Sequence, residues 1–395
     1  MSLDFQQIRE QVIRLGEKAP ARQQDLQEKR QLARELLESH ANELEFLRGK
    51  VQEVVRQYDP TLRCALPVSE PLTGSYPAPP LAKTVTILAA DGSQITPDRH
   101  AEVLYGLINV GALCMRSGSP EPPMPKVTSE LLYDEGLYTR AGTITEARLA
   151  LLRDLNERKI LAELAETAQP PVVTFTDGPM ELWGARDGGA EATEFQKSLN
   201  EYLEALERLH RMGVSTAGYV DKPAANLVVR LLEVAKLEQA QLAEIREWQP
   251  LRGVTDRHLF WGILDPGERS AVFAFQSQSA PSYHGPLALH FFYLNVGRVD
   301  KPALARVEVP AWVVEAPTLL DLLHSVLVDQ CRTMGSRAYP YLLHRAHETA
   351  VVTLPEKDQV SQMIAVELLR RGVEVGEVSQ KQASKEMGGR TRYKA

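Results

Sequence analysis

The sequence predicts an α/β protein in which a mixed β-sheet is flanked by helices and preceded by an N-terminal helical extension. Two observations carry this prediction. Short apolar runs rich in β-branched residues, such as those at 84–91 and 171–177, alternate with longer segments of helical periodicity. This alternation is typical of a sheet covered by helices. The region at 1–58, in contrast, shows helical periodicity alone.

The N-terminal region at 1–58 is expected to form helices. An apolar residue recurs there mostly at three- and four-residue steps, with charged and polar residues in between. These residues are Leu37, Ala41, Leu44, Val51 and Val55. Pro20 is expected to begin or break a helical segment. The apolar stripe either packs within its own subunit or forms part of a dimer or partner surface, and the sequence leaves both open.

The rest of the chain divides into three parts by composition. A Pro-rich segment at 59–83 is expected to be a linker, 84–385 to form the main domain, and 386–395 to be a basic tail. Strands are predicted at 84–91, 102–115, 171–177 and 214–220, with shorter strands within 259–314. Helices are predicted at 145–168, 193–212, 224–237, 317–335, 341–349 and 356–371.

The composition restricts the class of protein. With 395 residues, of which 44% are hydrophobic and 25% charged, the chain is expected to be globular. A net charge of -7 argues against a protein that coats nucleic acid, although a nuclease can combine an acidic site with a local basic groove. The three cysteines lie far apart and no apolar run approaches a membrane span. The N-terminus lacks a signal-peptide pattern, so a cytoplasmic location is expected.

The most informative pattern is an aspartate that follows a predicted strand and precedes glycine. It occurs twice, at Asp91-Gly92 and at Asp177-Gly178. Because hard divalent cations take oxygen ligands, two carboxylates at strand ends can converge on a metal ion. Each Asp-Gly pair taken alone is also a common turn signal. The occurrence of both, together with a third motif near the C-terminus, favours a metal site.

A third carboxylate is expected on the helix predicted at 145–168. The candidates are Glu146, Glu157 and Glu163. Their spacings of eleven and six residues do not place all three on one line of a helix, so at most two can face the site. A single glutamate on such a helix is more often part of a solvated face.

The motif near the C-terminus joins a tyrosine to two histidines. Tyr339 precedes Pro340, which suits the first turn of a helix, and His344 and His347 share one face of that helix. Histidine titrates near neutrality, so either residue can protonate a leaving group or orient a water molecule. Tyr339 can donate a hydrogen bond to a phosphate oxygen. Taken alone, the motif is equally consistent with a capped surface helix.

In this order along the chain, the motifs resemble the NurA family of DNA end-resection nucleases, which work with the HerA translocase. The resemblance spans about residues 84–385. It rests on Asp91-Gly92-Ser93, Asp177-Gly178-Pro179, the segment 218–222 and the segment 339–347. It implies a ribonuclease H-like fold, manganese binding, and a dimer whose central channel takes DNA.

The resemblance also implies a set of metal ligands. Asp91 and Asp177 match the two metal-binding aspartates of the family. Glu157 is the best match to the helix glutamate of the family, with Glu163 and Glu146 as alternatives.

Other roles follow from the same resemblance. Tyr339 and His347 match the tyrosine and the histidine near the family's catalytic site. Lys222 matches a lysine after a short strand, and both Lys222 and Ser93 are expected to contact DNA. Asp221 and the N-terminal helices depart from the family pattern, which puts the DNA path and the dimer contacts in doubt.

The carboxylate pattern and the resemblance together predict a metal-dependent deoxyribonuclease. The resemblance implies an exonuclease or single-strand endonuclease that acts in the resection of double-strand breaks during homologous recombination. Carboxylate-rich sites suit Mn²⁺, or Mg²⁺, better than zinc. The expected partners are DNA, a second copy of the chain and a hexameric HerA-like ATPase. The alternatives are a catalytically silent adaptor of a translocase, or a phosphotransferase or phosphatase on a similar sheet. The sequence has no Gly-x-x-x-x-Gly-Lys-Ser/Thr loop, which argues against an ATPase motor in this chain.

Overall fold

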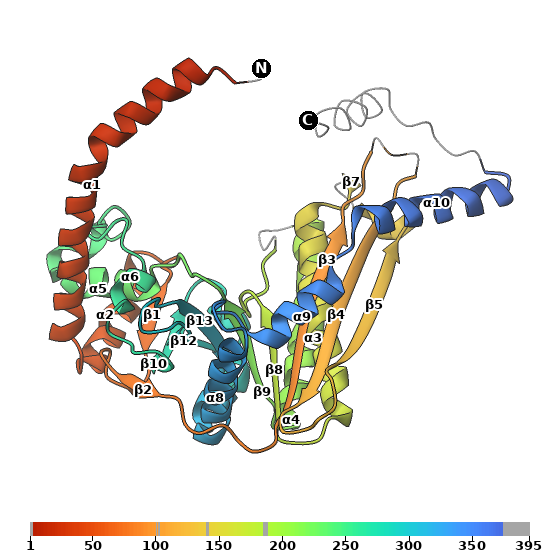
Figure 1. Ribbon diagram of the computed structural model, residues 1–395. Coiled ribbons are helices and arrows are strands. Elements are labelled where there is room, and N and C mark those ends of the chain that lie inside the picture. Colours follow the sequence, from red (N-terminus) through yellow and green to blue (C-terminus); the bar gives the residue numbers. More distant parts are fainter. Residues whose placement is uncertain (1–2, 100, 102, 140–141, 185–188, 374–395) are drawn as a thin grey trace. The chain divides into compact units, whose positions relative to one another are not determined.

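The computed structural model describes residues 3–99, 101, 103–139, 142–184 and 189–373. The chain divides into two compact units. The first unit comprises Met1–Leu81 and Ala217–Tyr339, and the second comprises Ala82–Thr216 and Pro340–Ala395. Figure 1 labels the elements of both, and each unit is described here by itself.

The second unit contains a mixed sheet with the strand order β5-β4-β3-β8. Its strands are β3 (Thr86–Ile95), β4 (Gly106–Arg116), β5 (Met124–Leu132) and β8 (Val172–Asp177). β3, β4 and β5 pair antiparallel, whereas β8 runs parallel to β3. An antiparallel meander followed by a parallel strand agrees with the ribonuclease H-like fold that the sequence predicts. A small hairpin, β6 (Tyr138–Thr139) and β7 (Gly142–Thr143), follows the turn η1 (Asp134–Leu137).

The described residues of this unit form the helices α3 (Glu146–Thr167), α4 (Gly189–Arg211), α9 (Tyr341–Ala350) and α10 (Leu354–Arg370). The hydroxyl of Thr145 caps α3 by accepting a hydrogen bond from the backbone N–H of Arg148 at 3.2 Å. α3 and α9 both pack on β3 and β4. They cover opposite faces, because a side chain at Gly92 would meet α3 whereas one at Gly111 would meet α9 (Figure 1).

The first unit contains a second set of strands in the order β1-β11-β12-β13-β9, all antiparallel, with β10 pairing β12 and β2. They are β1 (Cys64–Pro67), β2 (Ser75–Pro77), β9 (Ser215–Val220), β10 (Glu268–Ser270), β11 (Phe273–Gln276), β12 (Leu289–Asn295) and β13 (Leu304–Pro310). The first two residues of β9 belong to the second unit.

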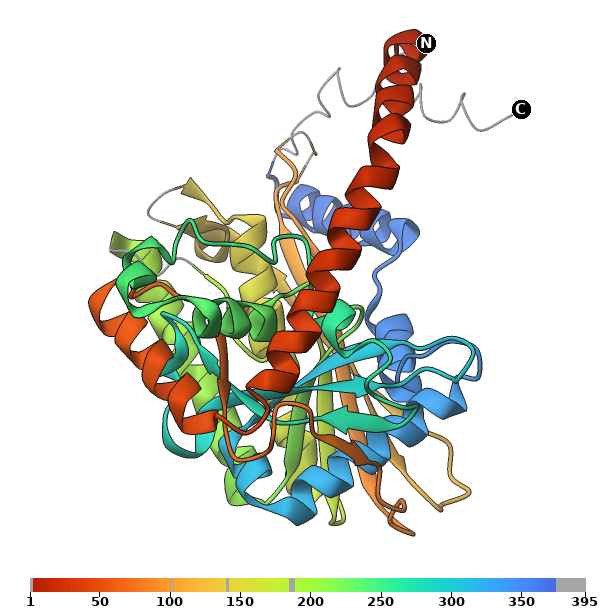
Figure 2. The same ribbon diagram turned by 90° about the vertical axis from the view of Figure 1, so that its left-hand side faces the viewer.

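The helices of the first unit are α1 (Phe5–Ser39), α2 (Leu44–Gln57), α5 (Leu227–Lys236), α6 (Asp256–Phe260), α7 (Ala311–Glu315) and α8 (Pro317–Thr333), with the short turns η2 (Gln239–Glu244), η3 (Ala280–Ser282) and η4 (Gly285–Leu287). α1 and α2 both pack on α5. The first half of α1 extends beyond the other elements of its unit (Figure 2). No helix among the described residues combines the length and apolar character needed to cross a lipid bilayer.

The predicted fold class, a mixed sheet flanked by helices with an N-terminal helical region, is confirmed. Three local expectations need correction. Pro20 lies inside α1 and neither begins nor ends it. The segment 59–83, expected to be a linker, carries β1 and β2. Of the two arrangements left open for the N-terminal stripe, packing within its own subunit is favoured, because Leu37 and Val51 are fully buried within the chain itself.

The third correction concerns Asp91, which does not end a strand. β3 continues to Ile95, because the residues after Asp91 stay paired with residues 107–110 of β4. Asp177 does end its strand, as predicted. The domain boundaries at 58, 83 and 385 stay predictions, and the basic tail at 386–395 lies outside the described residues.

Candidate metal and catalytic site

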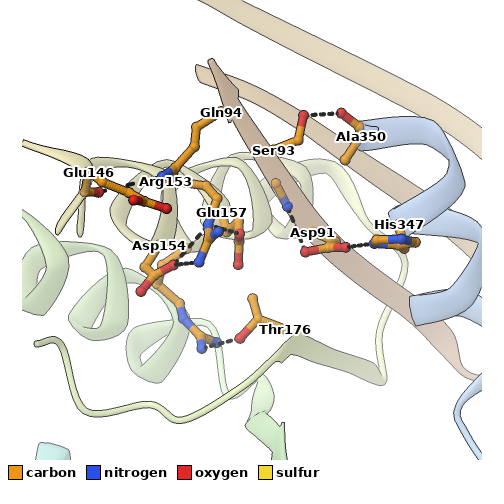
Figure 3. A network of polar contacts seen from close by, with 12 residues as sticks. Asp91, Ser93, Gln94, Glu146, Arg153, Asp154, Glu157, Thr176, His347 and Ala350 are labelled. Carbon is orange, nitrogen blue, oxygen red and sulfur yellow. Dashed lines mark hydrogen bonds and ion pairs between the residues drawn. The ribbon is translucent and has the colours of Figure 1, made fainter. Parts of the chain in front are cut away.

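Asp91 lies in the middle of β3, on the face of the sheet that α9 covers. It is paired across the ladder with Gly111 of β4. Its Oδ1 atom accepts a hydrogen bond from the backbone N–H of Gly92 at 2.8 Å. Its Oδ2 atom lies 2.7 Å from Nδ1 of His347 (Figure 3). The carboxylate is therefore held between its own strand and a helix from the far C-terminal part of the chain.

Asp177 occupies the corresponding position on the neighbouring strand. Ala90 of β3 pairs with Thr176 of β8, and the two strands are parallel. The residues that follow them, Asp91 and Asp177, therefore lie opposite each other on the two strands. Adjacent strands lie about 4.8 Å apart, and residues in register share a face of the sheet. Asp177 is exposed, and Gly178 follows it with a φ of +90°, a conformation that favours glycine and turns the chain away. The register thus brings two aspartates to the same level of two adjacent strands.

The position of α9 explains how His347 reaches Asp91. A Cβ atom at Gly111 would lie 2.7 Å from the backbone nitrogen of Ala350, so only glycine allows the helix to approach this closely. The carbonyl oxygen of Ala350 accepts hydrogen bonds from Oγ of Ser93 at 2.5 Å and from Nδ2 of Asn109 at 2.8 Å. These contacts fix the C-terminal end of α9 on the sheet. The imidazole of His347 stays 60% exposed and can meet a ligand.

Glu157 approaches from α3, on the opposite face. A Cβ atom at Gly92 would lie 2.8 Å from Oε1 of Glu157, so the bare backbone of Gly92 leaves the space that this carboxylate fills. Glu157 is buried. Its pKa is raised well above the ordinary value, first by burial and then by the negative charges of Asp154 and Asp91. A buried carboxylate close to two others attracts a cation.

Arg153 provides positive charge at this point. Its Nη2 atom donates a hydrogen bond to Oδ1 of Asp154 at 2.9 Å, and its Nε atom lies 3.5 Å from Oε1 of Glu157. Burial acts to lower the pKa of Arg153, but the charges of Asp154 and Glu157 outweigh it and the pKa is raised. The pKa of Asp154 is raised too, by burial, although Arg153 opposes that shift. Arg153, Asp154 and Glu157 form one charged cluster on α3 (Figure 3).

Arg158 supplies a second positive charge beneath this cluster. Its side chain is fully buried and donates hydrogen bonds to Oγ1 of Thr216 at 2.8 Å and to Oγ1 of Thr176 at 2.9 Å. Within the described residues no carboxylate lies within ion-pair distance of it, although its charge opposes the raised pKa values of Glu157 and Asp154. Since Thr176 precedes the aspartate that ends β8, Arg158 ties α3 to that strand end.

The other two helix glutamates lie elsewhere. Glu163 is exposed and lies 3.5 Å from Nζ of Lys126. Glu146 is exposed in the first turn of α3, where its backbone oxygen accepts a weak hydrogen bond from Gln94 at 3.4 Å. Of the three candidates, the structure brings only Glu157 into electrostatic contact with Asp91.

Two of the predicted site residues, Tyr339 and Lys222, belong to the first unit. Tyr339 is half-buried and packs edge-on against Tyr219, with the ring centroids 5.5 Å apart. Lys222 is exposed, has a φ of +44° and lies 3.8 Å from Asp221. The structure thus brings together Asp91, Glu157 and His347, and aligns Asp177 by register, within the second unit.

Sequence reasoning missed five residues of this site: Asn109, Gly111, Arg153, Asp154 and Arg158. One of them carried a signal. A single glycine within an apolar strand indicates a close backbone approach, which is the role of Gly111. The charged residues of α3 carried no signal that separates them from a solvated helix face.

The donor chemistry of the site fits a hard divalent cation, because Asp91, Glu157 and Asp177 all offer carboxylate oxygens. Among the described residues, no three His, Cys, Asp or Glu side chains are gathered closely enough to hold a metal ion as they stand. The guanidinium of Arg153 instead lies beside Glu157. Metal binding at this site therefore requires a rearrangement of side chains.

Comparisons with known proteins show what this chain is similar to. A model of the NurA domain family matches residues 85–352. The structure of the NurA nuclease from Sulfolobus solfataricus aligns with 84% of this chain and 93% of its own, at 11% identity and a TM-score of 0.42. LC9-RNase H1, a type 1 RNase H, aligns with 35% of this chain and 63% of its own, at 15% identity and a TM-score of 0.21. Drosophila Piwi aligns with 69% of this chain and 30% of its own, at 12% identity and a TM-score of 0.30. A search of curated protein sequences gave no match.

Proposed function

The chain belongs to the NurA domain family, and from this premise we propose that it is a metal-dependent deoxyribonuclease. One observation carries the proposal. Three elements, β3, α3 and α9, bring Asp91, Glu157 and His347 together, and the register of β8 adds Asp177 beside them. An acidic cluster with an exposed histidine at its edge suits the hydrolysis of a phosphodiester bond.

Each residue has a proposed task. Asp91, Asp177 and Glu157 hold Mn²⁺, or Mg²⁺. The bound ions would neutralise charge on the scissile phosphate and activate a water molecule. His347, whose imidazole is exposed and bonded to Asp91, donates a proton to the leaving oxygen or orients the water.

Residues outside the cluster are proposed to hold the DNA. Tyr339 donates a hydrogen bond to a phosphate oxygen, and the exposed ammonium of Lys222 contacts the backbone. For Ser93 the structure favours a different task, because its hydroxyl proton is given to the carbonyl oxygen of Ala350. A contact of Ser93 with DNA then uses only the lone pairs of its oxygen.

In the cell, we propose that the protein acts as an exonuclease or single-strand endonuclease in the end resection of double-strand breaks, in the cytoplasm. The partners are DNA, a second copy of the chain and a hexameric HerA-like ATPase. The family membership supports this role. A net charge of -7 supports the need for a partner or a second subunit, because phosphate binding requires a positive groove.

A second candidate function is a catalytically silent adaptor of a translocase. The observation in its favour is that Arg153 pairs with Glu157 and that no three carboxylates of the described residues are gathered for a metal ion. The adaptor predicts that the purified chain cleaves no DNA under any metal condition, with or without an ATPase partner.

The test is cleavage of single- and double-stranded DNA with Mn²⁺, Mg²⁺ or EDTA, comparing the wild-type chain with Asp91→Asn and Asp177→Asn. Each amide keeps the shape of the side chain but loses the charge that holds a metal, so we expect both variants to be inactive and folded. Asp358→Asn, at an exposed position on α10, is the matched control and keeps full activity. An Asp91→Asn variant that cleaves DNA at the wild-type rate would refute the metal site.

A substitution of His347 distinguishes an effect on the chemical step from an effect on DNA binding. We expect His347→Ala to lower the turnover about 10²–10⁴-fold, the usual contribution of a general acid or base, with little change in DNA affinity. His344→Ala is the control, because His344 lies three residues earlier on α9 and its Nε2 atom is 3.5 Å from Glu348. A loss of affinity with unchanged turnover would make His347 a residue that positions DNA.

A further inference from the structure

The side chain of Arg153 passes directly over Gly92 of β3. A Cβ atom at Gly92 would lie 2.4 Å from Cγ and 2.9 Å from Cδ of Arg153. The guanidinium then lies between two carboxylates of its own helix, at 2.9 Å from Asp154 and 3.5 Å from Glu157 (Figure 3). This places a positive charge at the point where a metal ion bound to Glu157 would sit.

The two arginines of the cluster differ in their freedom to move. Arg158 is fully buried and both of its Nη atoms donate to threonine hydroxyls. The side chain of Arg153 is 32% exposed, and its contact with Glu157 is long. In the described part of the chain, Arg153 provides the only cationic group within 4.0 Å of the Glu157 carboxylate. It can leave that carboxylate without uncovering the core.

We propose that Arg153 is a displaceable counter-ion, which occupies the place of a divalent cation beside Glu157 and moves to the scissile phosphate when the cation binds. The inference rests on the proposed function and deepens it. A divalent cation carries more charge than a guanidinium, so it binds the carboxylate oxygens of Glu157 more strongly and displaces Arg153 from them. The guanidinium, released close by, offers a planar fork of N–H donors that matches two phosphate oxygens.

Two observations make this exchange coherent. The described carboxylates are not gathered around one point, as expected when a side chain occupies the space between them. Asp154, one turn before Glu157, is partly exposed and hydrogen-bonds the same guanidinium. It keeps Arg153 next to the site after the release from Glu157, so that the charge stays within reach of bound DNA.

The test measures metal affinity apart from catalysis. Calorimetric titration with Mn²⁺, without DNA, compares the full-length wild-type chain with Arg153→Met, which keeps the aliphatic stem over Gly92, and with Arg153→Lys. Because the competing cation is lost, we expect Arg153→Met to bind Mn²⁺ about 3- to 10-fold more tightly than the wild type. Arg153→Lys retains a cation and binds Mn²⁺ like the wild type.

Cleavage kinetics at saturating Mn²⁺ test the second half of the proposal. We expect the turnover of Arg153→Met to fall about 10- to 100-fold, because a donor to the transition-state charge is missing, and Arg153→Lys to recover part of it. Arg148→Gln is the matched control. It lies on the same helix but pairs with Glu194 and Ser198, and it should leave both measurements unchanged.

The outcomes separate the two claims. Suppose that the wild type binds Mn²⁺ and cleaves DNA. Arg153→Met that then binds Mn²⁺ no more tightly than the wild type overturns the counter-ion role. Tighter binding with unchanged turnover overturns the move to the phosphate. A wild-type chain that neither binds Mn²⁺ nor cleaves DNA overturns the proposed function, and this inference with it.

Discussion

Among single residues, Glu157 occupies a position that is unfavourable for an ionised carboxylate. It is buried next to Asp91 and Asp154, and only Arg153 and Arg158 bring positive charge near it in the described part of the chain. An ionised carboxylate without full compensation destabilises the folded state. A divalent cation bound there, as we propose, would remove part of that cost and would couple metal binding to folding at this residue.

We therefore expect Glu157→Gln to unfold at a higher temperature than the wild type in EDTA at neutral pH, because the amide carries no charge. Added Mn²⁺ at about 100 times its dissociation constant stabilises the wild type by about 2.7 kcal/mol, and the variant by much less. Differential scanning calorimetry with and without metal measures both effects. Glu163→Gln, on an exposed part of α3, should respond to Mn²⁺ like the wild type. A full metal response in Glu157→Gln would exclude Glu157 as a ligand.

A second buried residue sets a dependence of stability on pH. His324 of α8 is buried, and its Nε2 atom lies 2.8 Å from the carbonyl oxygen of Gly267. Its pKa is lowered from 6.5 to about 4, chiefly by burial, with Arg269 acting in the same direction. The folded state therefore keeps His324 neutral in a range where the unfolded chain already takes up a proton. The contribution of His324 to the free energy of unfolding is fully present above pH 6.5 and is lost as the pH falls toward 4.

A shift of this size corresponds to about 3 kcal/mol in the free energy of unfolding between pH 7 and pH 4. We expect His324→Gln to lose less stability than the wild type over that range, whatever its stability at pH 7. Urea unfolding at a series of pH values measures the difference. His284→Gln, at an exposed position, is the control and should follow the wild-type curve. Parallel curves for His324→Gln and the wild type would contradict the assignment.

At the scale of elements, the site depends on two helices that approach β3 and β4 from opposite faces. Each approach uses a glycine on the sheet, Gly92 under α3 and Gly111 under α9. The backbone contact at Gly111 is the tighter constraint, since its neighbours are main-chain atoms of α9 that cannot rotate away. The alignment of His347 with Asp91 therefore depends on the absence of one side chain in β4.

Gly111→Ala should push α9 away from the sheet. We expect a loss of about 1–3 kcal/mol in the free energy of unfolding, as is usual for an overpacked core, and a larger loss of cleavage than of DNA binding. Gly136→Ala is the control, because its Cβ atom would find no neighbour closer than 3.8 Å. Thermal unfolding and cleavage kinetics of both variants test the point. An active, equally stable Gly111→Ala would show that α9 tolerates displacement.

The same elements show what local sequence patterns can predict. The periodicity and capping signals predicted α3 and the strand that ends at Asp177. They misplaced Asp91, because Asp-Gly signals a turn, whereas here the glycine serves a close approach within a continuous strand. They could not find Arg158 either, since its partners Thr176 and Thr216 come from two other strands. Contacts between distant segments depend on sheet register, which a local pattern does not contain.

At the scale of the whole molecule, α1 divides into two parts. Its C-terminal part carries Leu37, which is buried in the first unit, whereas the described residues up to Asp25 are exposed. Apolar side chains recur on the exposed part at three- and four-residue steps. They are Phe5, Ile8, Val12 and Leu15. This spacing suits contact with another helix, and it supports the proposed dimer or partner surface.

Removal of the exposed part tests that surface. We expect a chain that begins at Asp25 to unfold at the same temperature as the full chain, because no buried residue is lost. Sedimentation at micromolar concentration should give a dimer for the full chain and a smaller species for the shortened one. A chain that begins at Pro60 is a poorer choice, since it also loses the buried Val51. A full chain that sediments as a monomer would refute the dimer.

The different backbone settings of the two aspartates have a mechanical consequence. Asp91 is anchored in a strand that is paired with β4 from Thr86 to Ile95, whereas Asp177 is the last residue of its strand. In the metal site that we propose, Asp91 would therefore be the fixed ligand, and Asp177 would be the ligand that adjusts to ions of different radius. In hydrogen exchange, the amide of Asp91 should open only with the sheet, and the amide of Gly178 should exchange orders of magnitude sooner.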